Sequence, residues 1–329
     1  MFTRPTDLSD ADVRAALEHG WGLEVVTLEH APVGFGSHHW WVGTDDGRQW
    51  FATADDLRLR RHPDDEPLTA PLERLRAALT TATALREHGL DWVVAPSRNP
   101  AGSVVEPLGQ AYALAVCPAV EGRGFGWGPF EDPGHRAAVL DRLVELHGVD
   151  GCRDTARADD LGAAVLARLR ALLSDPGERW ESGPFGRDAW RVVVERGDVL
   201  ASLLDRYGAL VTEADPARFV LTHGEPHRAN TLLTRAGVVL VDWDTCLLAP
   251  PERDLWMLVE EDPGIRERYA AHTGTVLDPR LLAAFRLRWD LADVESCVRD
   301  LRSPHGDDED TRTAWTVLRG VLDPPTTSP

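Results

Sequence analysis

One stretch constrains what this chain can fold into more than any other. Residues 221–244 read LTHGEPHRANTLLTRAGVVLVDWD. Apolar runs at 219–221, 231–234 and 238–241 predict three short strands, with a tight turn at 236–237 between the last two. The first loop carries Glu225 and Asn230, and Asp242 follows the third strand. We therefore expect two carboxylates and an amide to converge, a set that suits a hydroxyl nucleophile and a metal-bound nucleotide.

The spacing within this stretch is informative. Glu225 and Asn230 are five residues apart, as are the Asp and Asn of the protein-kinase catalytic loop. In that template the acid accepts the proton of the attacking hydroxyl, while the Asn and a later strand-end Asp hold magnesium against the phosphates. The pattern predicts that Glu225 accepts or orients the hydroxyl proton and that Asn230 and Asp242 bind Mg²⁺.

The same residues carry a family resemblance. The matching positions are His223, Gly224, Asn230 and the run Asp242-Trp243-Asp244. They resemble the aminoglycoside phosphotransferase and choline kinase-like family, whose loop reads His-Gly-Asp-x-x-x-x-Asn and whose metal Asp lies in an Asp-Trp-Asp or Asp-Trp-Glu strand end. The runs 241–245 and 251–256 are most similar to the spectinomycin phosphotransferase-like branch.

The resemblance implies an α+β, two-lobed, protein-kinase-like fold. Residues 1–116 would form a small N-lobe with an antiparallel sheet and one helix, 117–122 a hinge, and 123–329 a mostly helical C-lobe with the catalytic loop and acceptor site. The resemblance also implies that Asp254 lies at the start of a helix and braces the catalytic loop.

Two positions depart from the family pattern. Glu225 stands where the family usually has Asp, so the carboxylate lies one methylene farther from the backbone with almost the same intrinsic pKa. Thr53 stands in the third predicted strand, where the family has the Lys that grips the α- and β-phosphates, and the chain contains no lysine at all. The candidates to replace this lysine are His38, His39, Arg58, Arg60 and Arg61.

These departures leave a second class open. A catalytically impaired pseudokinase or ligand-binding protein would keep the fold and lose the phosphate grip. A zinc site at His223 and His227 is disfavoured, because the glycine and proline between them prevent the helix that the metalloprotease motif requires.

Nucleotide-binding residues are expected upstream of the catalytic stretch. Gly34, Gly36 and Ser37 lie at the bend between the first two predicted strands, where backbone N–H groups are expected to cover phosphates. The resemblance implies that backbone groups from Val116 to Val120 meet the base of the nucleotide. The co-substrate would be ATP or GTP, with Mg²⁺.

The charge balance bears on the acceptor. With 54 acidic and 35 basic residues the formal net charge is -19, which disfavours nucleic acid and anionic membrane surfaces as partners. It is compatible with a small cationic acceptor, such as an aminoglycoside-like or aminocyclitol-like antibiotic or metabolite. Asp290, Asp293 and Glu295, on a long predicted helix at 279–302, are the candidate acceptor-binding residues. Such an O-phosphotransferase would serve antibiotic resistance or a biosynthetic route.

The rest of the sequence predicts the cellular compartment of the protein and the positions of its helices. None of the four cysteines is spaced for a metal or redox site, the first residues show no signal peptide, and no apolar run approaches about 20 residues. We expect a cytoplasmic monomer or homodimer. Helices are expected at 9–19, 72–88, 133–147, 160–173, 189–210, 279–302 and 311–321, with minor strands at 92–96 and 104–105.

Overall fold

The structure is a computed structural model that describes residues 1–34, 36–62 and 65–323. The chain divides into two compact units. Unit 1 contains Met1–Asp159 and Asp215–Asp278, and unit 2 contains Asp160–Ala214 and Pro279–Pro329. Unit 1 therefore contains both the N-terminal sheet and the catalytic stretch. The lobe boundaries expected at 116 and 122 stay a prediction.

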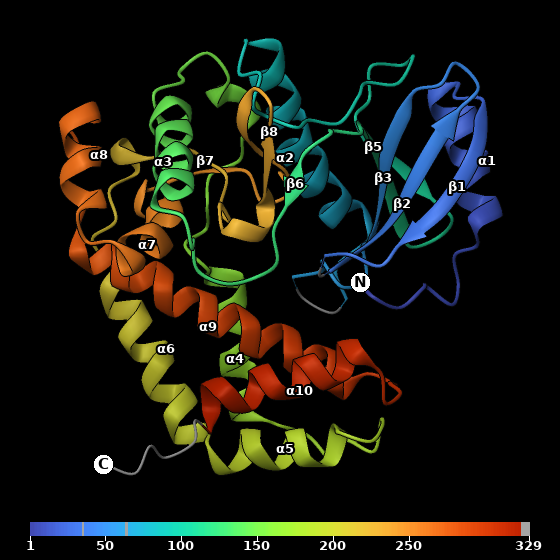
Figure 1. Cartoon of the computed structure of the whole chain (residues 1–329). Helices are drawn as coiled ribbons and strands as arrows, with labels where there is room; N and C mark the ends of the chain where they lie inside the picture. Colours follow the sequence, from blue (N-terminus) through green and yellow to red (C-terminus); the bar gives the residue numbers. More distant parts are fainter. Residues whose placement is uncertain (35, 63–64, 324–329) are drawn as a thin grey trace. The chain divides into compact units, whose positions relative to one another are not determined.

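The first part of unit 1 is an antiparallel five-stranded sheet (Figure 1). Its register aligns His39 with Thr53, and Thr53 with Ala115. The strands, in spatial order, are β1 Val25–Ala31, β2 Ser37–Thr44, β3 Gln49–Asp56, β5 Tyr112–Pro118 and β4 Glu106–Leu108.

Alternation along β3 sends side chains to two different environments. Trp50, Ala52 and Ala54 join the apolar core shared with helix α1 (Asp10–Trp21). Thr53 and Asp55 alternate with them and face the opposite side. On that side, Ala113 and Ala115 of β5 pack with the leucines of helix α2 (Thr69–Glu87).

The catalytic stretch forms two small antiparallel pairings in unit 1. Strand β7 (Val220–Thr222) pairs with β10 (Leu247–Ala249). Strand β8 (Thr231–Thr234) pairs with β9 (Gly237–Leu240) as the expected hairpin, and with the short β6 (Arg123–Gly124). Three helices complete this region: α3 Pro133–His147, α7 Glu252–Glu261 and α8 Ile265–Thr273.

Unit 2 is helical in its described residues. Its apolar core includes Leu169, Leu200, Leu204 and Leu301, and the long helix α9 packs against several of the others. The helices are α4 Ala163–Ser174, α5 Gly186–Glu195, α6 Gly197–Val211, α9 Pro279–Arg302 and α10 Glu309–Leu322.

Most expected elements are present, and three expectations were wrong. The single helix expected at 189–210 is two helices, because Arg196 leaves helical geometry (φ -110°, ψ 19°) just before Gly197. Residues 92–96 make only a bridge from Val93 to Leu240, and Pro96 has no N–H with which to extend it. The minor strand expected at 104–105 lies at Glu106–Leu108 instead.

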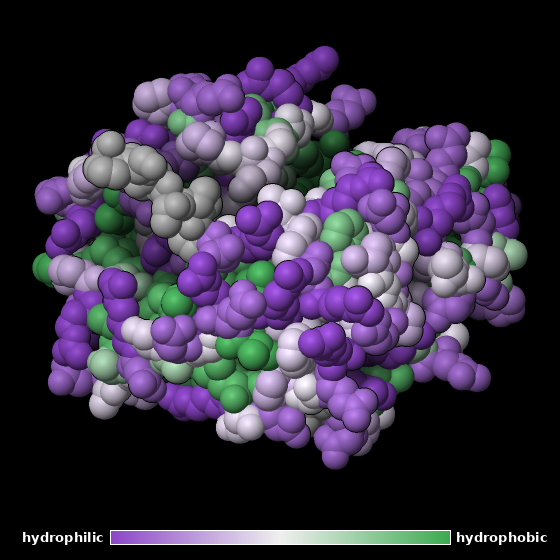
Figure 2. Space-filling view, turned by 90° about the horizontal axis from the view of Figure 1, so that it is seen from below, coloured by the Kyte–Doolittle hydropathy of each residue, from purple (hydrophilic) through white to green (hydrophobic). Residues whose placement is uncertain are grey.

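The surface follows the composition. Figure 2 shows a face dominated by hydrophilic residues, with smaller apolar patches between them, as expected from the surplus of acidic residues. Among the described residues, no helix combines the length and the apolar character that crossing a membrane requires.

Candidate active site

Backbone hydrogen bonds hold the three predicted catalytic residues near one another. The Asn230 side chain donates from Nδ2 to the Glu225 carbonyl oxygen at 3.0 Å. The Val241 N–H donates to the Asn230 carbonyl oxygen at 3.0 Å, which places Asp242, the next residue, beside the loop. The spacing therefore does bring Glu225, Asn230 and Asp242 together, as the sequence predicts.

His223 holds the loop from inside. Burial lowers the pKa of His223, so the ring is neutral at pH 7 and has one donor and one acceptor. Nδ1 accepts from the Glu225 N–H at 3.2 Å, and Nε2 lies 2.9 Å from the Val241 carbonyl oxygen, to which it donates. Its ring also packs on Trp243, with 4.5 Å between centroids. His223 is thus a structural link between the two predicted ligand-bearing segments.

Asp254 braces the loop from helix α7, as expected. Its two carboxylate oxygens accept from the backbone N–H groups of His223 at 2.9 Å and Gly224 at 2.6 Å. His147 Nε2 lies 3.1 Å from the same carboxylate, and Tyr269 in turn lies 2.9 Å from His147 Nδ1. Burial alone would raise the pKa of Asp254, but the bond and charge of His147 hold it below its ordinary value.

Gly224 is required for two separate reasons. Its φ of 102° lies in a region that L side chains rarely adopt. A Cβ at this position would also overlap the Arg253 guanidinium. That guanidinium is buried and donates to Thr222 Oγ1 at 2.7 Å and to the Thr245 carbonyl at 2.8 Å. The loop and Arg253 therefore fit together only without a side chain at 224.

Asp242 has an unusual backbone and a crowded charge environment. It is one of two described non-glycine residues with positive φ, at 67°. Asp242 as a residue is exposed, but the surrounding protein desolvates its carboxyl group. That desolvation, with the charges of Asp244 and Glu225, raises its pKa well above the ordinary value. A surplus of negative charge is thus concentrated where a cation is expected.

The donor set fits a magnesium ion that also binds phosphate. Asp242 and Asn230 offer oxygen atoms, which Mg²⁺ prefers, and Mg²⁺ usually takes only one or two protein carboxylates with water and phosphate oxygens. No group of three His, Cys, Asp or Glu side chains in the described ranges is placed to hold a metal alone. The site therefore suits a metal shared with a nucleotide better than a resident ion.

The Glu225 carboxylate extends away from these backbone contacts. Its side chain is 37% exposed, and its Oε2 lies 3.8 Å from Nε2 of His227. An exposed carboxylate at the edge of the loop is accessible to an incoming hydroxyl. Its role as base stays a prediction.

The contact that the structure describes for the Thr53 hydroxyl is with a neutral histidine. This hydroxyl lies 3.1 Å from Nδ1 of His39, which stacks on Phe51 at 5.1 Å between centroids. Burial lowers the pKa of His39 to about 3, so its ring is neutral at pH 7. His38 is also buried, with its pKa lowered to about 4.

The two arginines after β3 have different partners. Arg58 binds Asp56 at 2.6 Å, Asp7 at 2.8 Å and the Tyr112 hydroxyl at 3.1 Å. The side chain of Asp56 lies on the same face of β3 as those of Ala52 and Ala54, the face that packs against α1. Because Arg58 binds Asp56, it also lies on the α1 side of the sheet. Arg60 instead binds Asp55 at 2.5 Å, and also Asp244, which is two residues from Asp242.

The residues expected to contact the nucleotide lie in three places in unit 1. Gly34 and Gly36 have φ of 73° and 86°, and Phe35 between them lies outside the described residues. The Ser37 hydroxyl donates to Asp55 at 2.7 Å. Val116 is fully buried, and its carbonyl accepts from the Ser97 N–H, whereas Val120 is half-buried. Their roles toward a nucleotide stay predictions.

The candidate acceptor residues lie on α9 in unit 2. Asp290 is paired with Arg286 at 2.5 Å, and Glu295 with Arg168 at 2.7 Å. Asp293 is half-buried. The charges of Asp290 and Glu295 are thus partly balanced within unit 2, and contact of the three residues with an acceptor stays a prediction.

Four supporting residues were missed by sequence reasoning. Arg253, His147, Tyr269 and Asp55 are buried polar residues that hold the loop or an arginine. Arg253 is next in sequence to Asp254, the residue predicted to brace the loop, and this position only weakly indicates its role. His147 and Tyr269 have no local pattern, because their partners lie more than 100 residues away in the sequence. Asp55 pairs with Arg60 only five residues later, but no motif marks that pair.

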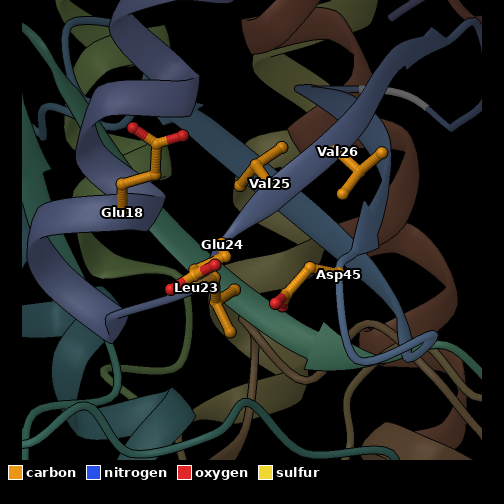
Figure 3. A pocket seen from close by; sticks show the side chains of 6 residues that line it. All are labelled: Glu18, Leu23, Glu24, Val25, Val26 and Asp45. Atoms are coloured by element: carbon orange, nitrogen blue, oxygen red, sulfur yellow. The ribbon is translucent and has the colours of Figure 1, made fainter.

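A hollow of about 490 Å³ lies elsewhere in unit 1 (Figure 3). No candidate site residue lines it. The lining residues, from the end of α1, the start of β1 and the turn after β2, are Glu18, Leu23, Glu24, Val25, Val26 and Asp45.

Known proteins resemble this chain in both sequence and structure. A profile described as the phosphotransferase enzyme family, APH, matches residues 27–287. Protein StrN of Streptomyces griseus is 30% identical over 266 residues, which are 75% of this chain and 77% of that protein.

Solved structures agree in fold. Spectinomycin phosphotransferase APH(9)-Ia, in complex with ADP and spectinomycin, superposes with a TM-score of 0.69 at 15% identity, over 97% of this chain and 96% of its own. Macrolide 2'-phosphotransferase MphH from Brachybacterium faecium gives 0.55 at 21% identity, over 98% and 100%. At these identities the likeness shows the fold, and it confirms the expected kinase-like α+β architecture.

The family match covers well over half of the chain, and it includes the loop, the hairpin and the strand end described above. The resemblance expected from the motifs is thereby confirmed. The chain belongs to the phosphotransferase enzyme family, whose members transfer phosphate to hydroxyl groups of small molecules.

Proposed function

We propose that this protein transfers the γ-phosphate of ATP or GTP to a hydroxyl group of a small cationic acceptor. The observation that carries the proposal is the convergence of Glu225, Asn230 and Asp242 through the hydrogen bonds of the 223–241 backbone. Acid, amide and strand-end acid are the groups that such a transfer needs.

Each residue has a distinct role in the proposed reaction. The acceptor oxygen forms a bond to the γ-phosphorus, and the bond from that phosphorus to the β,γ-bridging oxygen breaks. Glu225 accepts or orients the proton of the acceptor hydroxyl. Asn230 and Asp242 would hold Mg²⁺, which neutralises negative charge on the phosphates.

Two solved relatives support a nucleotide and a divalent cation. The spectinomycin phosphotransferase was solved with ADP, and an amicoumacin kinase, hAmiN, with AMP-PNP and Ca²⁺. In this chain, backbone N–H groups around Gly34, Gly36 and Ser37 would cover the phosphates. Backbone groups between Val116 and Val120 would meet the base, and Thr53 would lie on the phosphate side of the sheet.

A cationic acceptor is proposed from charge. The net charge is -19, and α9 carries Asp290, Asp293 and Glu295. The spectinomycin phosphotransferase acts as a precedent for an antibiotic acceptor in this fold. The protein would then act in resistance or in the biosynthesis of such a compound.

The test is transfer of labelled γ-phosphate to a panel of amino sugars, aminocyclitols and neutral sugars. Wild-type protein and Asp242→Asn would be compared in Mg²⁺, with mass spectrometry of the acceptors. We expect one phosphate to be added to a cationic acceptor by the wild type only. Nucleotide binding without any transfer, to the acceptors or to water, would instead identify a catalytically impaired relative.

A further inference from the structure

Arg60 connects the loop after β3 to the segment that carries Asp242 and Asp244. It follows β3 by four residues, and its carbonyl accepts from Arg74 of α2 at 2.8 Å. The side chain is 26% exposed, so it is neither fully buried nor free in solvent. The loop after β3 therefore directs a guanidinium toward the strand end that carries Asp242.

Two acids hold this guanidinium in place. Asp55 is almost fully buried and lies on the same face of β3 as Thr53, and Asp244 follows Asp242 by two residues. Asp55, Asp244 and Asp242 together hold the pKa of Arg60 above its ordinary value, despite the opposing effect of burial. The charge of Arg60 thus acts directly on the acids of the candidate metal site.

One edge of the guanidinium remains for a ligand. The contacts that the structure describes for this side chain, to Asp55, Asp244 and Ser37, all use Nη2. An arginine has five N–H donors in a planar fork that matches phosphate geometry. Donors on Nη1 and Nε are therefore left for phosphate oxygens without loss of the anchoring ion pairs.

The alternatives nearby are weaker. His39 is neutral at pH 7, and Thr53 offers a hydroxyl but no charge. Arg58 is held by Asp56 and Asp7, toward the α1 side. We infer that Arg60, anchored by Asp55 and Asp244, binds the nucleotide phosphates and replaces the lysine that this chain lacks. This inference rests on the proposed function, because it presumes a nucleotide in the same site.

A comparison of the affinities for ADP and for adenosine distinguishes an effect on phosphate recognition from an effect on folding. By calorimetry, Arg60→Gln should weaken ADP binding at least about tenfold and leave adenosine binding nearly unchanged, because a lost charged hydrogen bond has about that effect. Arg58→Gln is the matched control, since it also removes an arginine that pairs with a β3 acid. It should leave the ratio of the two affinities unchanged.

Arg60→Gln leaves Asp55 buried without its arginine, which destabilises the fold. Asp55→Asn combined with Arg60→Gln removes both charges, and the same selective loss of ADP binding is expected. Adding Thr53→Lys to either variant should restore part of the ADP affinity, because residue 53 lies on the same face as Asp55.

The outcomes distinguish this inference from the proposed function. Suppose that the wild type transfers phosphate, but that Arg60→Gln keeps its affinity for both ADP and adenosine or loses affinity for both equally. Arg60 is then structural, and the inference is wrong while the proposed function stands. If the wild type binds neither ADP nor adenosine, at millimolar concentration and with acceptors present, both are wrong.

Discussion

Asp242 shows how one residue can be tested without disturbing its neighbours. Its positive φ favours asparagine over alanine as the substitute, because asparagine tolerates that region and has nearly the same shape. Asp242→Asn should lower phosphoryl transfer by at least about a hundredfold, through loss of a charged metal ligand.

Removal of one charge from a cluster of acids should leave the melting temperature unchanged or raise it. Steady-state kinetics in Mg²⁺ and a thermal melt check the two expectations. Near-normal turnover would show that Asp242 does not hold the metal.

Substitution of Asn230 tests the same proposed metal site, with a partial effect expected in place of a near-complete loss. Asn230→Ala removes an amide oxygen from the proposed metal site and the hydrogen bond to the Glu225 carbonyl. We expect a lower rate and a higher Mg²⁺ requirement, measured by titrating Mg²⁺ at saturating nucleotide. A titration that overlays that of the wild type would exclude Asn230 as a ligand.

Gly224 and Gly20 form a matched pair at the level of the backbone. Gly224→Ala meets both a positive φ and the Arg253 guanidinium, so we expect a loss of more than about 2 kcal/mol in the free energy of unfolding, with loss of activity. Gly20→Ala lies within α1 with nothing within 4 Å of its added Cβ, and it should be neutral or slightly stabilising. Denaturant titration of both variants gives the comparison, and equal effects would contradict this account of the loop.

At the scale of elements, Glu66 and Arg74 connect the loop after β3 to α2. Arg74 donates from both terminal nitrogens to Glu66 at 2.7 Å, and it also holds the Arg60 carbonyl. The Arg74 bonds, which outweigh burial, lower the pKa of Glu66 to about 2, from 4.5. The stabilisation from this carboxylate is therefore full above about pH 4.5 and is lost as the pH falls toward 2.

Glu66→Gln should accordingly cost about 2 kcal/mol of unfolding free energy at pH 7, and the difference from wild type should shrink as the pH falls from 4.5. Unfolding by denaturant across this pH range checks it. Glu87→Gln is the control, because its pair with Arg98 is mostly exposed and should contribute less. A difference that does not change with pH would contradict the assignment of the effect to this carboxylate.

Sequence patterns correctly predicted those elements that depend on contacts between residues close together in the chain. The hairpin of β8 and β9 and the spacing from Glu225 to Asn230 lie within 25 residues, so the sequence alone was sufficient for them. The contact from Arg60 to Asp244 joins residues 184 positions apart, and no periodicity encodes it. The break at Arg196 was missed because the helical spacing of apolar residues resumes at Leu200, seven residues after Val193, although residues 195–198 contain no apolar residue and Gly197 is a local signal of the break.

At the scale of the whole molecule, the acidic surplus should govern encounter with substrates. The net charge of -19 attracts a cation and repels a nucleotide, and salt screens both effects. We expect the KM for a cationic acceptor to rise severalfold between low salt and about 0.5 M salt, while the KM for a neutral acceptor stays nearly constant. Equal salt dependence for the two acceptors, or a best acceptor that is neutral or anionic, would contradict the charge argument.

Three acidic residues of α9 give a more local check of the same idea. Neutralising Asp290, Asp293 and Glu295 together should weaken binding of a cationic acceptor and flatten its salt dependence. The substitutions also release Arg286 and Arg168, so a thermal melt must accompany the measurement. An unchanged KM in a folded triple variant would place the acceptor elsewhere.

A guanidinium in place of an ammonium changes which reagents can covalently modify the proposed phosphate-binding site. Reagents and inhibitors that capture the conserved amine of kinase-like enzymes, such as acylating nucleotide analogues and aldehydes, have no ε-amino group to react with in this chain. Arginine-directed dicarbonyls should act instead at Arg60, and a bound nucleotide should shield it. Acetylation of lysine, which removes the charge of an ammonium group, cannot occur in this chain, so any reversible control of phosphate binding must act on another group.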